Sequence, residues 1–435
     1  MKSKQATKIK QEADKLIDKF NTLYPARKLL LFFVAGSHFF DLNTKKSDLD
    51  FKGIYLPSAE EFYNGESRRK MIDWKTKNKK GEKNNNEDID CTIFSITKVF
   101  ELLKNGDFNV MEMFFVPQDK IIIDSAEMKY YRNMRKSLLV NDISSFLGFI
   151  KKEYKRYGIN AYHYKSQEDF LNFLQKYDHH TKLRDIWQEI EEYAINEQHI
   201  MFTESLTGNN VHVPSIKVAQ RLYQNTVKVE YVRQALAENL AKYGHRQKQC
   251  AKAGVEFKGL YHALRLIYQA NDLYDYGEFK IPFSRERHGI LWCTKTSQIG
   301  QEKLFNLIDK EIENLYTREK TVSSNKHQVN SLIDKLAFKL QGQMKLKYII
   351  DLGIVKKDGM LIYYIQNPSN TIKATAVKRN GLSIRYIKNP SEELQLLAIE
   401  ENPWSSIYMK NMTSKAKELF EARKHIKTRP KTLRL

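Results

Sequence analysis

A turn and a strand near the start of the chain carry residues that together could bind a metal ion and a phosphate. Gly36 and Ser37 follow an apolar run, and Asp48 and Asp50 come 11 and 13 residues after Ser37. Alternate side chains of a strand share one face, so both carboxylates should project together, with Lys52 beside them. Hard cations such as Mg²⁺ prefer oxygen ligands and complete their coordination with water and phosphate oxygens. The spacing predicts a divalent-metal site for Mg²⁺, or for Mn²⁺ in its place.

A third carboxylate is expected from residues 88–96, which read as another strand. Asp88 and Asp90 share a face of that strand, so both are candidates, and we favour Asp90. Two ions about 3.5–4 Å apart among such carboxylates clamp the attacking and leaving oxygens of a phosphoryl transfer. Asp48, Asp50 and Asp90 are therefore the predicted metal ligands and catalytic residues. The alternative is that Asp48 and Asp50 only cap a turn.

The Gly36-Ser37 pair supplies the other half of the predicted site. Glycine permits close approach of the backbone, and Ser37 can open a short helix whose free N–H groups favour phosphates. We therefore expect Gly36, Ser37 and the neighbouring Lys52 to bind the phosphates of a nucleoside triphosphate.

A cationic stripe far along the chain could bind phosphates as well. Lys258, His262 and Arg265 fall at positions i, i+4 and i+7 of an expected helix, so they share one face. A guanidinium can bind a phosphate through two parallel hydrogen bonds. We predict that this stripe binds the triphosphate or the phosphate of the acceptor. A solvated basic face is the alternative.

The charge of the chain favours a polyanionic partner. Lys and Arg number 73 against 52 Asp and Glu, and the formal net charge is +21. Nucleic acid is the first expectation and an anionic membrane surface the second. A basic helix with interleaved tyrosines is a candidate contact with nucleic acid, although a plain surface helix fits its residues equally well. Its cations are Lys151, Lys152, Lys155 and Arg156.

Hydrophobic patterns predict the elements that must position these residues. Apolar runs at 29–34, 48–56 and 88–96 predict buried strands, and residues 6–23 predict an amphipathic helix. The polar, basic stretch 66–87 is expected to be a loop outside the core.

The order of these patterns predicts an α+β fold with several domains. Residues 1–125 should form a small mixed β-sheet with flanking helices, which carries the predicted site. Residues 126–316 read as a mainly helical domain that closes over the site, because apolar residues recur there at three- and four-residue spacing.

A repeat occupies the C-terminal region. The triplets Asn367-Pro368-Ser369, Asn389-Pro390-Ser391 and Asn411-Met412-Thr413 recur every 22 residues. Each unit has room for two short helices, which bury their apolar faces only by stacking on the next unit. Residues 330–423 should therefore form a small helical solenoid, followed by a basic tail over 424–435.

The motifs resemble the DNA polymerase β-like nucleotidyltransferase superfamily, whose pattern is Gly-Ser, a short gap, Asp-apolar-Asp and a later Asp. Three segments resemble its RNA-ligase-associated branch: SDLDFKGIYLPS, DIDCTIFSITKVFELLKNGDFNVMEMFFVP and KGLYHALRLIYQANDLYDYGEFKIPF. The likeness runs from near residue 30 to near residue 315. The chain departs from the branch at two places. Phe40-Asp41 stands where the branch usually has an aromatic residue and Gly, and Ile159-Asn160-Ala161 replaces a Lys-Gly-rich continuation.

The resemblance implies Mg²⁺-dependent transfer of a nucleoside monophosphate from a triphosphate, with loss of pyrophosphate. Asp90 would complete the site of the ion that activates the acceptor hydroxyl. Together with the positive charge, the resemblance favours an RNA end as acceptor, in RNA repair or processing. One alternative is transfer of AMP or UMP to a protein or small molecule. Another is a non-catalytic scaffold that binds RNA, or whose repeats recruit a protein such as an RNA ligase.

Cysteine usage and apolar runs indicate the compartment. Cys91, Cys250 and Cys293 are far apart and have no zinc-binding spacing, which fits a reducing environment. The N-terminal residues MKSKQATKIKQEADK lack the apolar core of a signal peptide, and no apolar run is long enough for a transmembrane helix. We expect a cytoplasmic protein without a membrane partner.

Overall fold

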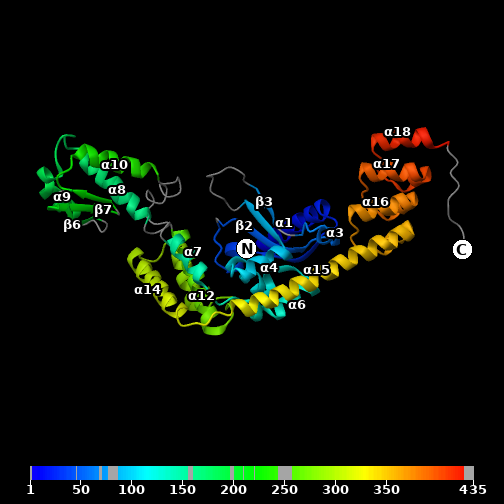
Figure 1. Ribbon diagram of the computed structural model, residues 1–435, viewed down its shortest axis with the longest axis horizontal. Coiled ribbons are helices and arrows are strands. Elements are labelled where there is room, and N and C mark those ends of the chain that lie inside the picture. Colours follow the sequence, from blue (N-terminus) through cyan, green and yellow to red (C-terminus); the bar gives the residue numbers. More distant parts are fainter. Residues whose placement is uncertain are drawn as a thin grey trace.

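The computed structural model describes residues 2–45, 47–67, 71–76, 87–154, 160–195, 200–208, 210–219, 221–242 and 257–425 of the 435-residue chain. These residues form an elongated molecule with a β-sheet module in its middle (Figure 1). A small α/β unit lies at one end, and the C-terminal repeats are stacked at the other. None of the described helices combines the length and the apolar character needed to span a bilayer.

A five-stranded mixed sheet forms the central module, in the order β3-β4-β2-β1-β5. Strands β2 and β4 run parallel, and the other neighbouring strands of this sheet run antiparallel. The expected α+β class and the three predicted strands are confirmed, whereas the sequence patterns did not indicate β3 and β5. The strands are β1 (Lys28–Val34), β2 (Leu49–Leu56), β3 (Met71–Lys75), β4 (Ile89–Ser95) and β5 (Ile121–Asp124).

The loop expected over residues 66–87 is wrong for its middle part. Met71–Lys75 form β3, which pairs antiparallel with residues 90–94 of β4. Ile72 is buried in the core, and Trp74 is partly buried with the ammonium of Lys19 4.5 Å from its ring centre. Two apolar residues at alternate positions are enough for one face of an edge strand. The strand was not predicted because basic residues surround these two apolar positions in the sequence.

Apolar residues cover both faces of the sheet. Helix α1 (Lys2–Leu23) packs on one face, where the ring of Phe20 lies 5.9 Å from that of Tyr55. The other face belongs to one continuous core with helices from much later in the chain, including Leu147 of α7, Leu264 of α12 and Ile308 of α14. These helices are α4 (Ile96–Lys104), α7 (Ser144–Tyr154), α12 (Phe257–Tyr276) and α14 (Gln301–Glu319). Because they share a core with the sheet, they are held against it.

Shorter elements complete this module. They are α2 (Gly36–Phe39), α3 (Ala59–Tyr63), α5 (Phe108–Met111), α6 (Ala126–Asn133), α13 (Arg285–Lys295) and the 3-10 helices η1 (Glu112–Phe115), η2 (Gln118–Lys120) and η3 (Arg135–Leu138).

A separate α/β unit lies between α7 and α12, so the expectation of a helical domain over 126–316 is wrong for residues 200–224. Those residues form an antiparallel sheet in the order β6-β7-β8 with its own apolar core. Ile216 and Val218 of this sheet are buried at alternate positions. The strands could not be predicted, because periodicity does not distinguish helix from strand in so short an apolar run. The domain boundaries stay predictions. The elements are α8 (Asn160–Leu174), η5 (Leu183–Ile186), α9 (Trp187–Ala194), β6 (Ile200–Leu206), β7 (His212–Val218), β8 (Arg221–Gln224) and α10 (Val229–Ala241).

The long helix α15 (Lys326–Lys357) connects the central module to the repeats. Each unit contains a 3-10 helix and an α-helix, as the repeat predicted. The last residue of each triplet is the N-cap of an α-helix. The side chains of Ser369, Ser391 and Thr413 accept hydrogen bonds from backbone N–H groups three residues later. The elements are η6 (Gly359–Tyr364), α16 (Asn370–Arg379), η7 (Gly381–Tyr386), α17 (Glu392–Glu401), η8 (Pro403–Tyr408) and α18 (Ser414–Arg423).

The stacking of the repeats depends on the close approach of one unit to the next at Gly381. A Cβ at this position would lie 2.6 Å from the carbonyl oxygen of Ala398 and 3.1 Å from the backbone nitrogen of Asn402. Gly381→Ala should therefore overpack the interface, at a cost of about 1–3 kcal/mol. Hydrogen exchange of amides in residues 381–408 should speed up by roughly tenfold or more, measured by mass spectrometry.

Gly353 of α15 provides the matched control, because a Cβ there would meet no atom within 4 Å. Gly353→Ala should leave exchange in the repeats unchanged or slow it slightly, since Ala is the better helix former. Equal exchange in the two variants would contradict close packing at Gly381.

Candidate functional site

Three carboxylates meet at one edge of the central sheet. Asp50 of β2 stands opposite Asp90 of the parallel strand β4, and Asp48 precedes β2. Each offers an oxygen, and these oxygens lie within 4.8 Å of one another. Asp88 is buried, and among the described residues it is not part of this carboxylate cluster (Asp48, Asp50 and Asp90). The structure thus brings Asp90 to the other two.

The composition of the carboxylate cluster fits a hard divalent cation. All its donors are carboxylate oxygens, the ligands that suit Mg²⁺ and Mn²⁺. Three like charges this close repel one another, and a bound cation would offset that repulsion. All three residues are partly buried, so a cation could still be reached by a substrate.

Gly36 fits against the carboxylate cluster in a way that other residues could not. It begins α2 with φ at +60°, and a Cβ built on it would coincide with the carboxylate of Asp50. The backbone N–H of Ala35 also donates to the carbonyl of Asp50, at 2.8 Å. The Oγ of Ser37 is enclosed and has no hydrogen-bond partner among the described residues. The predicted phosphate turn therefore lies directly on the Asp50 carboxylate.

Contacts from two other segments, η2 and α13, fix the end of this turn. Asp41 adopts φ of 55°, a left-handed conformation that Asp tolerates better than most residues. Glycine usually stands here in the branch that the chain resembles, and Asp41 adopts a left-handed conformation that glycine reaches without strain. Lys120 pairs with its carboxylate at 2.5 Å, and His288 lies 3.2 Å from its carbonyl oxygen. Lys295 donates to the carbonyl of Leu42 at 2.6 Å.

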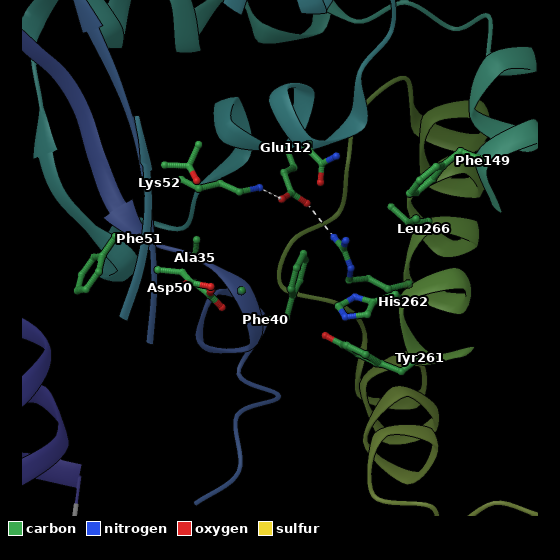
Figure 2. A pocket seen from close by; sticks show the side chains of 15 residues that line it. Ala35, Phe40, Asp50, Phe51, Lys52, Glu112, Phe149, Tyr261, His262 and Leu266 are labelled. Atoms are coloured by element: carbon green, nitrogen blue, oxygen red, sulfur yellow. Dashed lines mark hydrogen bonds and ion pairs between the residues drawn. The ribbon is translucent and has the colours of Figure 1, made fainter. Parts of the chain in front are cut away.

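A buried glutamate joins two of the predicted phosphate-binding cations. Glu112 accepts from Lys52 of β2 at 3.1 Å and from Arg265 of α12 at 2.8 Å (Figure 2). Gln269 also donates to Glu112, at 3.3 Å. Burial alone would raise the pKa of the Glu112 carboxyl, but the charges of Lys52 and Arg265 outweigh it and lower the pKa below its usual value. Glu112 is therefore ionised at neutral pH and ties the sheet to α12.

The three predicted cations of helix α12 have different surroundings. Arg265 is buried, with its guanidinium 4.7 Å from the ring centre of Phe40, so a solvated basic face is wrong for this residue. His262 lines the pocket, whereas the side chain of Lys258 lies outside the described part of the structure. Burial raises the pKa of the neighbouring Tyr261 to about 12, so its hydroxyl stays protonated at neutral pH.

Asp50, Asp90 and the α12 residues line one cavity of about 300 Å³, at the small end of the range for ligand pockets. In Figure 2, Asp50 lies on the sheet side, and Tyr261 and His262 face it from α12 with Phe40 between. The lining residues are Ala35, Gly36, Phe40, Asp50, Phe51, Lys52, Asp90, Thr92, Asn109, Glu112, Phe149, Tyr261, His262, Arg265 and Leu266.

The predicted nucleic-acid helix is only partly described. Lys151 is exposed on α7, with its ammonium 5.4 Å from the ring centre of Tyr316. The side chain of Lys152 and the whole of Lys155 and Arg156 lie outside the described residues. Tyr154, one of the tyrosines interleaved in this helix, is buried against Phe305 and is therefore not available to stack on bases. The cations of this helix stay a prediction.

Comparisons with known proteins agree with the resemblance that the sequence motifs indicate. The mixed sheet and the carboxylate cluster fit the same resemblance to polymerase β-like nucleotidyltransferases. Residues 5–182 match the model of a family described as "RlaP: RNA repair pathway DNA polymerase beta family", which confirms the predicted resemblance over that part of the chain. An uncharacterized 38.9 kDa protein of the nrdC-mobD intergenic region of Enterobacteria phage T4 is 25% identical over 264 residues, 57% of this chain and 77% of the phage protein. No solved structure matches the chain.

Sequence reasoning missed Glu112, although a signal was present. Glu112 is a lone carboxylate within the apolar run VMEMFF, and a carboxylate that will be buried needs a charged partner. The partners come from β2 and from α12, more than 150 residues further along the chain. No spacing rule connects residues so far apart.

Glu112→Gln should destabilise the protein at neutral pH, because it leaves Lys52 and Arg265 without a buried counter-charge. Breaking such a pair typically costs about 3–5 kcal/mol. The folded-state pKa of Glu112 lies below the unfolded value of 4.5, so its stabilisation is present above that pH and is lost as pH falls through the folded pKa. Thermal melts of both proteins should therefore converge as the solution is acidified.

Glu101→Gln is the matched control, because Glu101 pairs with Lys98 in an exposed pair on α4. Its effect should stay below about 1 kcal/mol at any pH. A difference between Glu112→Gln and wild type that does not change with pH would contradict the buried carboxylate pair.

Proposed function

We propose that the protein is a nucleotidyltransferase that joins a nucleoside monophosphate from an NTP to an RNA end. The carboxylate cluster carries the proposal, since it lies on two parallel strands and directly against the Gly36 turn. The match of residues 5–182 to an RNA repair polymerase β family supports the reaction class.

The roles of the residues follow from their positions. Asp48, Asp50 and Asp90 would hold divalent cations, Mg²⁺ or Mn²⁺. Such ions, when bound, neutralise phosphate charge and favour the deprotonated form of a bound hydroxyl. Gly36 leaves room for the Asp50 carboxylate, and Ser37, which follows it in the turn, would donate to a phosphate oxygen. The turn would thereby orient the triphosphate against the carboxylates.

Lys52, on the same strand as Asp50, and Arg265, on α12, would attract the triphosphate from two sides of the pocket. Both contact Glu112, so the trio carries a net charge of +1 rather than +2. Glu112 holds both cations in fixed positions, and this preorganisation lowers the cost of ordering them around a phosphate. His262 lies on the same wall and can donate a further hydrogen bond.

RNA is the proposed acceptor for two reasons. The net charge of +21 favours a polyanion, and the matching family is described by an RNA repair pathway. Nucleotide transfer to a protein or a small molecule would use the same carboxylates, so the acceptor has to be identified by experiment.

Asp48→Asn/Asp50→Asn should abolish the transfer, because the amides remove two negative charges from the cation site. Incubation with labelled NTPs, Mg²⁺ and total RNA should label RNA in the wild type. Labelling by the variant should fall by at least about 100-fold, since even second-shell changes at metal sites cost 10- to 100-fold.

Asp14→Asn/Asp18→Asn removes two exposed carboxylates of α1 and should leave the labelling unchanged. Labelled protein bands without labelled RNA would select transfer to protein. Equal RNA labelling by the wild type and by Asp48→Asn/Asp50→Asn would contradict the proposed site.

A further inference from the structure

The 3-10 helices of the repeats present side chains that the proposed active site does not use. Tyr364, Tyr386 and Tyr408 occupy the same position in successive 22-residue units. Tyr363 and Arg385 likewise occupy one position, immediately before them. These five residues form what we define as the tyrosine–arginine face.

The members of the tyrosine–arginine face contact one another in an unbroken series. The ring of Tyr363 lies 5.0 Å from the ring of Tyr364 and 5.0 Å from that of Tyr386 in the next unit. The guanidinium of Arg385 lies 4.6 Å from the ring of Tyr386 and 5.7 Å from that of Tyr408. Planar groups from three units therefore form one surface.

This surface is open to solvent although its rings are large. Tyr363 is 64% exposed, Tyr364 75% and Tyr408 41%, and Arg385 is exposed as well. Each unit already buries other residues, such as Ile362 and Ile384, in the solenoid core. Tyr386 is partly buried against that core, whereas the rings of Tyr363, Tyr364 and Tyr408 extend beyond it. Exposed aromatic rings gathered in one place mark a binding surface.

The charges around the face indicate an anionic partner. The three 3-10 helices contain Arg385 and no other charged residue. The last turns of α15 and α16 add exposed cations beside η6 and η7: Lys356, Lys357, Lys378 and Arg379. The equivalent positions before η8 are Glu400 and Glu401, so the positive end of the face is the one nearer the central module.

The solenoid is attached to the central module at that positive end. The ring of Tyr348 on α15 lies 4.7 Å from that of Tyr63 on α3, and the hydroxyl of Thr371 donates to Glu60. A ligand on the repeats would therefore have a defined position relative to the sheet.

We propose that the tyrosine–arginine face binds single-stranded RNA by stacking unpaired bases on the tyrosines and on Arg385. Aromatic rings and guanidinium planes accept any base, and cations beside them attract the phosphates. RNA repeats a base and a phosphate in every nucleotide, and the face repeats a tyrosine in every 22-residue unit. A regularly repeating ligand suits such a repeating surface. The inference rests on the proposed function only in its choice of RNA, and it gives the acceptor a second site of attachment.

The test measures binding of a short, fluorescein-labelled single-stranded RNA to the full chain by anisotropy, without NTP or divalent metal. Tyr364→Ala/Arg385→Ala removes two exposed members of the face. The matched control Tyr231→Ala/Lys417→Ala removes an exposed tyrosine of α10 and an exposed cation of α18. We expect the control to bind as the wild type does and the face variant to bind roughly tenfold or more weakly.

Heparin separates stacking from charge, because it is a polyanion without bases. The face variant and the control each lose one positive charge, so they should bind heparin equally well. Equal RNA binding by the two variants would overturn the proposal, as would equal losses for RNA and heparin in the face variant. Failure of the wild type to bind the RNA would also overturn it and would favour a protein partner.

The outcome is independent of the active site. Asp48→Asn/Asp50→Asn should bind the labelled RNA at least as tightly as the wild type. The protein could bind RNA through the face and yet transfer no nucleotide. That result would support RNA binding by the tyrosine–arginine face and contradict the proposed function.

Discussion

The close approach of the Gly36 turn to Asp50 is the constraint on which the candidate site depends. Two neighbouring parallel strands place Asp50 beside Asp90, and the segment between β1 and β2 must then cross the carboxylates without a side chain. Positive φ and the absence of a Cβ are both required at Gly36, and glycine alone supplies both without strain. The turn and the carboxylates therefore act as one structural unit.

A second interaction extends this unit to the helices. Glu112 is buried between Lys52 of the sheet and Arg265 of α12, and a buried carboxylate is stable only with such partners. The same helix shares the apolar core of the sheet through residues such as Leu264. The pocket wall opposite the carboxylates is thus held by both charge and packing, which suits a site that must position a charged substrate.

The local parts of this arrangement could be predicted from the sequence. Continuous apolar runs revealed β1, β2 and β4, and the Asn-Pro-Ser triplets revealed the capped helices of the repeats, because each pattern depends on near neighbours. The patterns failed where two alternating apolar residues lay in a basic stretch, as at Ile72, and where short runs hid the strands around Ile216. They also failed for Glu112, whose partners are distant in sequence. Asp90 could be favoured over Asp88, but only the register of β2 and β4 brings it to the cluster.

The central claim, that the Gly36 turn and the carboxylates form one cation site, can be tested by titrating Mn²⁺ and observing its paramagnetic resonance. Gly36→Ala introduces a methyl group where the Asp50 carboxylate lies, whereas Gly65→Ala places one in open space at a similarly positive φ. We predict that the wild type and Gly65→Ala bind Mn²⁺ alike and that Gly36→Ala, with an unchanged circular dichroism spectrum, binds it at least about tenfold more weakly. Equal Mn²⁺ affinity in Gly36→Ala and Gly65→Ala, or no binding by the wild type, would contradict the account.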